Sequence, residues 1–126
     1  MPGIYEMYVK KHFCAAHSLK GYPGDCARMH GHNWMIEVYI RCRELDNIGM
    51  GIDLREIKQG VGDVLDDLDH ANLDELPAFR DQNPTSENIA RLLYVEIGKR
   101  LNSERVSVSK VKVCETPGAG SFYWED

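Results

Sequence analysis

The sequence HGHNWMIEVYIRC, residues 30 to 42, alternates between two kinds of side chain. Every second residue from His32 to Ile40 falls on one face, and all of them except the histidine are apolar. This period of two predicts a long β-strand with one face against a hydrophobic core. Extending the alternation backwards places His30 on the face of His32, about 7 Å away along the backbone. Two imidazoles at this spacing can converge on one metal ion.

The segments around this strand predict two strands, two helices and two strands in chain order. Alternation and turn residues indicate the strands, while capping residues and helically spaced apolar residues indicate the helices. The expected strands are residues 4–14, 30–42, 106–115 and 121–124, and the expected helices are 53–68 and 85–101, with a loop over 71–83. The order ββααββ indicates an α+β fold, a four-stranded antiparallel sheet with both helices on one face. The other face would be solvated or covered by partner subunits.

Length and composition favour one globular domain over residues 1–126. The chain is 43% hydrophobic and 28% charged, and its net charge of -5 argues against a nucleic-acid-binding surface. No apolar run reaches transmembrane length, and the N-terminus lacks the pattern of a signal peptide. Scattered cysteines without a CxxC pair fit a reducing compartment. We therefore expect a cytoplasmic protein that binds neither membrane nor nucleic acid.

A third histidine, His17, lies upstream of His30 and His32. Three histidines match the protein ligands of a catalytic zinc site, which keeps one position open for water or substrate. Zinc is the default for such nitrogen ligands, and iron, nickel and copper are compatible with them. The alternative is that these are ordinary half-buried histidines. The His-Gly-His spacing favours the metal site.

Three residues separate Cys26 from His30 of the His-Gly-His pair, and a loop rich in glycine and proline precedes Cys26. Two functional roles are compatible with this position. Cys26 is either the fourth ligand of a closed, structural zinc site or a free thiolate that acts on whatever the metal holds. A buried, inert thiol is the third alternative. Spacing alone leaves the choice open.

Five further residues, at three places in the chain, carry weaker signals. Asp69 and His70 are adjacent at a predicted helix end, where they form either a proton-relay pair or a solvated last turn. Glu115 ends a predicted strand, where its carboxylate is either exposed or able to accept two parallel hydrogen bonds from a planar N–H edge. Thr85 and Ser86 are interpreted first as the residues that cap the second helix.

The chain resembles the 6-pyruvoyl-tetrahydropterin synthase and QueD family, which has the tunnelling fold (T-fold). The resemblance covers nearly the whole chain, and its motifs occur in the family's order. They are Phe13-Cys14-Ala15-Ala16-His17, Cys26-Ala27-Arg28-Met29-His30-Gly31-His32-Asn33, Gly51-Ile52-Asp53-Leu54, Leu68-Asp69-His70, Asn83-Pro84-Thr85-Ser86-Glu87-Asn88 and Cys114-Glu115-Thr116-Pro117. No single motif is decisive, but together they are highly specific.

The resemblance implies a role for each metal candidate and for the cysteine. In this family three histidines hold a catalytic zinc ion, and His17, His30 and His32 match them. The family's cysteine is not a ligand but the base that abstracts a proton, which corresponds to Cys26.

The resemblance also implies the remaining site residues. An Asp-His pair completes the family's catalytic set and matches Asp69 and His70. A glutamate after the third strand anchors the pterin ring and matches Glu115. The residues that open the second helix contact the pterin, which implicates Thr85 and Ser86.

The implied reaction starts from 7,8-dihydroneopterin triphosphate. Three residues separate Cys26 from His30, as in QueD-like members, so we expect a 6-carboxy-5,6,7,8-tetrahydropterin synthase of queuosine biosynthesis. The alternatives are a 6-pyruvoyl-tetrahydropterin synthase and a non-catalytic, zinc-stabilised pterin-binding module. The family also implies a homohexamer, a dimer of trimers, with active sites at subunit interfaces. Glu115 would then serve a metal site on a neighbouring chain.

Overall fold

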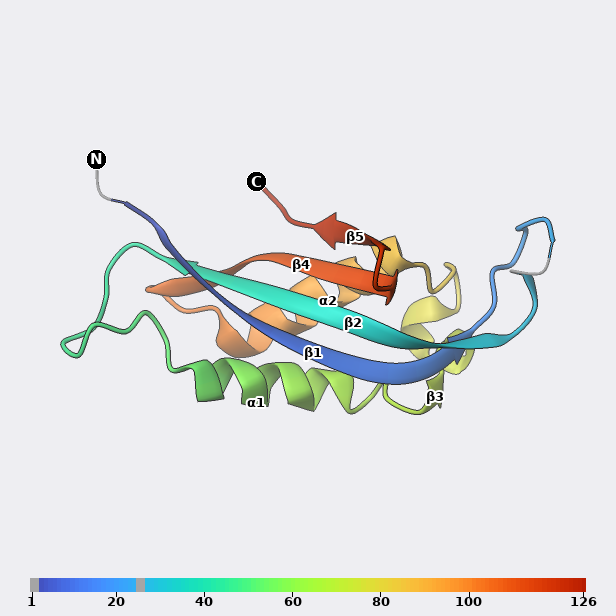
Figure 1. The fold of residues 1–126 in the computed structure, drawn as a ribbon, viewed down its shortest axis with the longest axis horizontal. Coiled ribbons are helices and arrows are strands. Elements are labelled where there is room, and N and C mark those ends of the chain that lie inside the picture. The colour runs from blue at the N-terminus through green and yellow to red at the C-terminus, as the bar shows by residue number, and fades with distance from the viewer. Residues whose placement is uncertain (1–2, 25–26) are drawn as a thin grey trace.

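Two long strands form the centre of the sheet, β1 (Tyr5–His17) and β2 (His30–Cys42). They pair antiparallel along their whole length, with His17 opposite His30. In the computed structural model, which describes residues 3–24 and 27–126, the connection between them projects from one end of the sheet (Figure 1). The predicted strand over 30–42 is confirmed, and the first strand continues beyond the predicted Cys14 to include His17.

The remaining elements are two helices, which cover one face of the sheet, and the other strands of the sheet. In order they are α1 (Leu54–Leu65), β3 (Ala71–Asn72), two 3-10 turns (Leu73–Glu75 and Pro77–Phe79), α2 (Ser86–Leu101), β4 (Val106–Thr116) and β5 (Ala119–Tyr123). The strand order is β3-β1-β2-β4-β5, and β3 is parallel to β1 while the other neighbours are antiparallel. The predicted four-stranded antiparallel sheet is therefore wrong: the sheet has five strands and is mixed. The additional strand, β3, follows α1 in the chain and lies at the edge of the sheet beside β1.

β3 was missed because it contains only Ala71 and Asn72, too few residues for any alternation. Long-range contacts bring this short segment to the edge of β1. The His70 N–H donates to the Cys14 carbonyl, and the Cys14 N–H donates to Asp69 Oδ1 at 2.9 Å across 55 positions of sequence. Local pattern carries no information about such a pairing.

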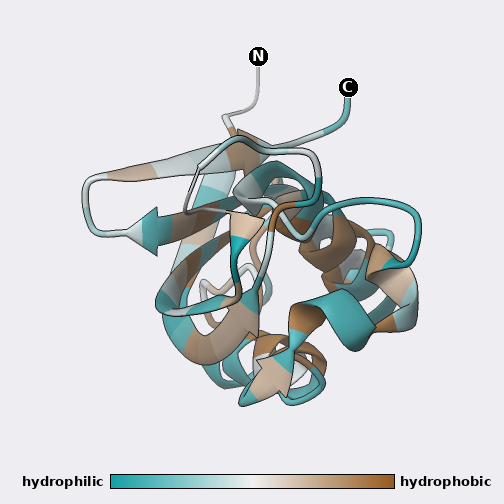
Figure 2. Cartoon of the chain, turned by 90° about the vertical axis from the view of Figure 1, so that its right-hand side faces the viewer, coloured by the Kyte–Doolittle hydropathy of each residue, from teal (hydrophilic) through white to brown (hydrophobic). Residues whose placement is uncertain are grey.

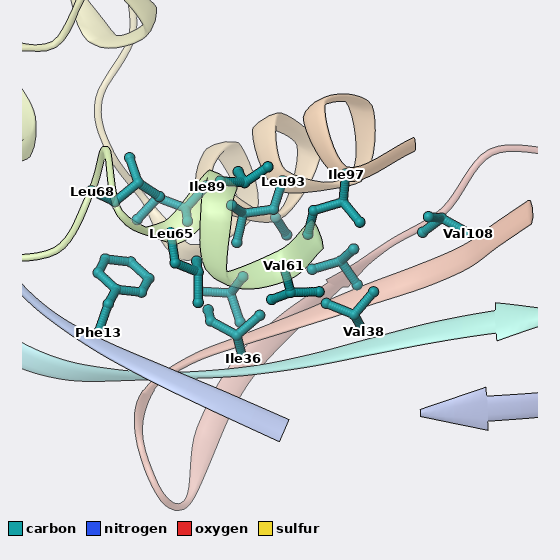
Figure 3. Packing of buried hydrophobic residues seen from close by; sticks show 14 of the residues in the cluster. Phe13, Ile36, Val38, Val61, Leu65, Leu68, Ile89, Leu93, Ile97 and Val108 are labelled. Carbon is teal, nitrogen blue, oxygen red and sulfur yellow. The ribbon is translucent and has the colours of Figure 1, made fainter. Parts of the chain in front are cut away.

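The hydrophobic core lies between the helices and one face of the sheet, as predicted. Phe13, Ile36, Val38 and Val108 from the strands pack against Val61 and Leu65 of α1 and Ile89, Leu93 and Ile97 of α2 (Figure 3). From Trp34 to Cys42 every second residue of β2 is buried, whereas the residues between them are partly or fully exposed. Figure 2, which looks along the length of the sheet, shows hydrophobic and hydrophilic segments in both the strands and the helices.

Each helix begins at a residue whose side chain caps it. The two helices also pack closely against each other. The Asp53 carboxylate accepts from the Arg55 N–H at 2.8 Å at the start of α1, and Thr85 Oγ1 accepts from the Asn88 N–H at 3.1 Å at the start of α2. Gly60 of α1 packs against Leu101 at the end of α2, where a Cβ would lie 2.9 Å from a Leu101 methyl group. This glycine therefore allows the close contact between the helices.

The face of the sheet opposite the helices carries polar and aromatic side chains. Glu37 accepts a hydrogen bond from Tyr39 and lies 3.5 Å from the ammonium group of Lys112. The bond to Glu37 raises the pKa of Tyr39 to about 12. Lys110 lies over the Tyr39 ring at 4.8 Å from its centre. Among the described residues, no helix is long and apolar enough to cross a membrane.

Candidate functional site

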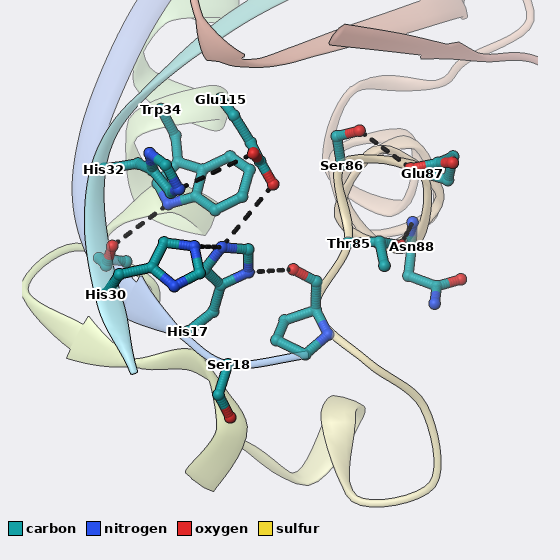
Figure 4. A network of polar contacts seen from close by, with 12 residues as sticks. His17, Ser18, His30, His32, Trp34, Thr85, Ser86, Glu87, Asn88 and Glu115 are labelled. Carbon is teal, nitrogen blue, oxygen red and sulfur yellow. Dashed lines mark hydrogen bonds and ion pairs between the residues drawn. The ribbon is translucent and has the colours of Figure 1, made fainter. Parts of the chain in front are cut away.

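The three histidines converge at the end of the sheet from which the β1–β2 connection projects (Figure 4). His17 is the last residue of β1, while His30 and His32 are the first and third of β2. Their candidate ligand atoms all lie within 4.8 Å of one another. Strand pairing places His17 opposite His30, and alternation points His17 and His32 toward the helices, on the side of the core.

Two of the imidazoles have their tautomer set by a main-chain carbonyl. His17 donates from Nδ1 to the Pro84 carbonyl at 2.8 Å, and His30 donates from Nδ1 to the Arg28 carbonyl at 2.7 Å. A carbonyl can only accept, so the Nε2 atom of each neutral ring carries a lone pair. This is the usual arrangement of metal-binding histidines, in which the other ring nitrogen is held by a carbonyl or carboxylate.

The Nε2 atoms of the three rings lie close together, so a cation between them could bind their lone pairs. His17 Nε2 and His30 Nε2 are 3.0 Å apart, although each is an acceptor in the neutral ring. His32 Nε2 is buried and is the atom without a hydrogen-bond partner among the described buried side chains. A buried polar atom without a hydrogen-bond partner lowers the free energy of unfolding, so the protein is less stable. The three residues therefore fit a metal ion, and zinc is the default for three imidazole nitrogens.

Glu115, near the end of β4, lies beside the same three histidines. Its Oε1 is 3.7 Å from His17 Nε2 and its Oε2 is 3.7 Å from His32 Nε2. Burial lowers the pKa of His32, with Glu115 opposing this shift and the other two histidines adding to it. The expectation that Glu115 serves a neighbouring chain is not met, because the carboxylate lies against the histidines of its own chain.

Trp34 forms the wall behind the imidazoles. It is fully buried, and its ring meets those of His17 and His32 edge-on, with centres 4.9 and 5.3 Å apart. Its indole N–H donates to the Ala15 carbonyl at 3.3 Å. Alternation along β2 predicted that Trp34 shares a face with His32, but it gave no signal for the contact with His17.

Thr85 and Ser86 lie at the start of α2, across from the histidines in Figure 4. Thr85 Oγ1 is the helix cap, and its hydroxyl hydrogen has no acceptor among the described residues. Ser86 Oγ bonds Ser121 Oγ at 2.8 Å and Glu87 at 3.0 Å. Both side chains therefore have structural partners, in agreement with their first interpretation as helix-start residues.

Asp69 and His70 form a pair that is not part of the converging group of His17, His30 and His32. His70 Nδ1 is 3.0 Å from Asp69 Oδ2, and the backbone N–H of Cys14 is the main cause that lowers the pKa of Asp69. His70 is strongly exposed and has a φ of 59°, in the left-handed region. It lines an open hollow of about 440 Å³ with Cys14 and Asn33, and residues of the histidine end of the sheet, Gly31 and His32, border the same hollow. By strand alternation the side chains of Cys14 and Asn33 point to the sheet face opposite His17 and His32.

Cys26, the remaining candidate, lies outside the described residues.

The residues that orient the candidate metal ligands His17 and His30 were not predicted from the sequence. The carbonyls of Pro84 and Arg28 are main-chain groups, so side-chain identity gave no signal for them. Asn83 and Asn88 were interpreted as part of a helix start, whereas both take part in hydrogen bonds around Pro84.

Fold and site together define a small α+β protein with three imidazoles placed to hold a metal ion at one end of the sheet. The model of the family "6-pyruvoyl tetrahydropterin synthase" matches residues 6–126. The chain belongs to this family of pterin synthases, which includes relatives named for the 6-carboxy and for the 6-pyruvoyl product.

Individual relatives resemble this chain in sequence, and one solved structure resembles it in fold. A 6-carboxy-5,6,7,8-tetrahydropterin synthase of Rickettsia bellii is 30% identical over 123 residues, covering 83% of this chain and 89% of the relative. A 6-pyruvoyl tetrahydrobiopterin synthase of Dictyostelium discoideum is 32% identical over 95 residues, covering 74% and 68%. The solved structure of the Caenorhabditis elegans 6-pyruvoyl tetrahydropterin synthase superposes with a TM-score of 0.87 at 30% identity, covering 98% and 97%.

Proposed function

We propose that the chain is a zinc-dependent 6-carboxy-5,6,7,8-tetrahydropterin synthase. This lyase would convert 7,8-dihydroneopterin triphosphate into 6-carboxytetrahydropterin, acetaldehyde and triphosphate, an early step toward queuosine and other 7-deazapurines. The observation that carries the proposal is the convergence of three imidazoles beside one carboxylate, that of Glu115. Membership of the pterin synthase family supports the substrate class.

The metal would be held by His17, His30 and His32 through their Nε2 atoms. Bound there, zinc would act as a Lewis acid that makes the hydroxyl groups of the substrate side chain more acidic. The carbonyls of Pro84 and Arg28 keep two rings in the tautomer that binding requires. No rearrangement of these rings is then needed when the ion arrives.

Glu115 would hold the heterocycle. An ionised carboxylate can accept two parallel hydrogen bonds from the N–H edge of a pterin, which fixes the ring in one orientation. Since Glu115 lies 3.7 Å from two of the histidines, the ring would sit beside the metal ligands with its side chain in reach of them. The free hydroxyl hydrogen of Thr85 and the neighbouring Ser86 would add contacts from the start of α2.

Proton transfer would use Cys26, Asp69 and His70. As a thiolate, Cys26 would remove a proton from the substrate side chain. Asp69 accepts from His70 Nδ1, which leaves Nε2 of that ring to exchange the second proton. Because this pair is not part of the group that converges with the histidines of its own chain, it would serve a site on another copy. A homohexamer built from two trimers, with sites at the subunit interfaces, would meet this requirement.

The second candidate is 6-pyruvoyl-tetrahydropterin synthase, in which the substrate loses triphosphate and its side chain is rearranged without cleavage. The solved relative from Caenorhabditis elegans and the Dictyostelium relative carry names of this type. The three-residue gap between Cys26 and His30 favours the 6-carboxy product, as in QueD-like members.

One experiment separates the candidates. The zinc-loaded protein is incubated with 7,8-dihydroneopterin triphosphate, and the products are identified by mass spectrometry. Carboxytetrahydropterin with acetaldehyde supports the proposal, and pyruvoyl-tetrahydropterin supports the second candidate. Unchanged substrate would reject both and leave a zinc-stabilised pterin-binding protein.

A further inference from the structure

The segment that orients His17 is a short stretch before α2. The Pro84 carbonyl accepts the His17 Nδ1–H at 2.8 Å, although the two residues are 67 positions apart in sequence. Pro84 is buried but has no N–H of its own, so neighbouring residues must hold it in place. The residue before it, Asn83, provides that anchorage.

The side chain of Asn83 binds the backbone of the chain just after β1. Its Oδ1 accepts from the Lys20 N–H at 2.9 Å, and its Nδ2 donates to the Lys20 carbonyl at 2.9 Å. One amide thus pairs with both polar groups of a single residue, three positions beyond His17. The loop that leaves β1 and the segment that carries Pro84 are fixed to each other by this pair of bonds.

The main chain of Asn83 connects the same segment to α2. Its carbonyl accepts from Asn88 Nδ2 at 2.9 Å and from the Thr85 N–H at 2.9 Å. The Asn88 N–H in turn donates to Thr85 Oγ1, the cap of the helix. Asn83 is therefore hydrogen-bonded in two directions. Its side chain bonds the loop that follows β1, and its carbonyl bonds the start of α2.

We propose that Asn83 is a positioning residue for the metal centre: its side-chain amide holds the Pro84 carbonyl against His17 and so sets how tightly the three histidines bind the ion. This inference rests on the proposed metal-binding function. Both polar atoms of the Asn83 side chain bond Lys20, so we do not expect Asn83 to be a ligand of the ion. It acts by keeping the His17 ring in one tautomer and one orientation, which is what a partner of a ligating histidine contributes.

The test compares Asn83→Ala with Asn102→Ala in the full chain. Asn102 also fixes a loop through its side chain, since its Oδ1 accepts from the Val108 N–H at 2.7 Å, but at the other end of α2. Zinc affinity is measured by competition with a chelator, and the melting temperature is measured without metal. Loss of Asn83 should weaken zinc binding by about 10-fold or more, in the range seen for outer partners of metal ligands. The Asn102→Ala variant should bind zinc as the wild type does.

A second readout reports the geometry of the centre directly. Cobalt replaces zinc, and the visible absorption spectrum of the bound ion is recorded. The spectrum should change in Asn83→Ala and not in Asn102→Ala. In Asn83→Asp the acceptor for the Lys20 N–H is kept, so its affinity should fall between those of the wild type and Asn83→Ala.

Three results would overturn the inference. Wild-type zinc affinity and an unchanged cobalt spectrum in Asn83→Ala would show that the amide does not position His17. An equal loss of affinity in Asn83→Ala and Asn102→Ala would show a general effect of stability. A wild-type chain that binds no zinc would reject the inference together with the metal-dependent function itself, whereas the first two results leave that function intact.

Discussion

At the scale of single residues, His17 shows what the sequence can and cannot predict. Its place among the candidate metal ligands followed from the nearby His-Gly-His pair and from the chemistry of imidazole. Its complete burial and its bond to Pro84 did not, because they depend on a partner 67 positions away. Residue type predicts which atoms can bind an ion, whereas the carbonyls that orient those atoms are common to all residues.

The role of Cys26 is tested by Cys26→Ala. We expect the variant to keep its zinc and to lose turnover by about 10²- to 10⁴-fold, the usual contribution of a positioned general base. Zinc content is measured by mass spectrometry of the metal, and turnover by product formation. Cys42→Ala, at the far end of β2, serves as the control and should retain turnover. A fall in zinc content with Cys26→Ala would instead make Cys26 the fourth ligand of a closed site.

The role of Glu115 is tested by Glu115→Gln. An amide of the same shape cannot accept two bonds as an ionised carboxylate does, so kcat/KM should fall by about 10- to 100-fold. Zinc content should remain that of the wild type. Glu104→Gln, at an exposed position of the loop before β4, is the matched control. Loss of zinc from the Glu115 variant would contradict the ring-anchoring role and indicate a metal ligand.

At the scale of elements, the two glycines inside α1 differ in their surroundings. Alanine favours a helix over glycine by about 1 kcal/mol. A Cβ at Gly62 would have no neighbour closer than Lys11 Nζ at 4.0 Å, whereas one at Gly60 would meet Leu101 Cδ2 at 2.9 Å. Gly62→Ala should therefore stabilise the protein, and Gly60→Ala should be less stable than Gly62→Ala by about 1–3 kcal/mol, the cost of overpacking. Denaturant unfolding of both variants checks this. Equal stabilities would refute the close helix contact.

The long elements were predictable because each carries its own signal. β2 alternates over its whole length, and both helices have caps and an apolar stripe, so their presence and type followed from local rules. β3 has two residues, and the turn before it includes His70 with a positive φ, which no local preference of histidine requires. The missed element is the one whose existence depends on pairing with Ala15 and Ala16 of β1.

At the scale of the whole molecule, the candidate groups lie on two faces of one sheet. His17, His32 and Glu115 lie on the helix side, whereas Cys14 and Asn33, which line the hollow with His70 and His32, point their side chains to the other face. The resemblance implied sites at subunit interfaces, but a list of residues carries no information about which face of the sheet each occupies. We expect a site that uses both groups to combine two copies of the chain.

Mixing two inactive variants tests this arrangement. His32→Ala lacks a metal ligand and His70→Ala lacks the relay, so each alone should be inactive. After refolding an equal mixture, about a quarter of the sites should combine an intact metal centre with an intact relay from another copy. Recovery of about that fraction of wild-type turnover is the expected result. An inactive mixture, with oligomers of mixed composition present, would place both groups in one chain.

The pairing of His17 with His30 has a consequence for the sheet itself. All three metal candidates belong to one antiparallel pair of strands, so an ion bound there would act as a removable cross-link across the end of that pair. Without it, strand ends tend to fray. Amide hydrogens of residues 14–17 and 30–34 should therefore exchange with solvent faster in the metal-free protein than in the zinc-loaded one, while those near Tyr5 and Cys42 should not differ. Hydrogen-exchange mass spectrometry with and without zinc measures this, and uniform exchange along both strands would show that the ion does not join them.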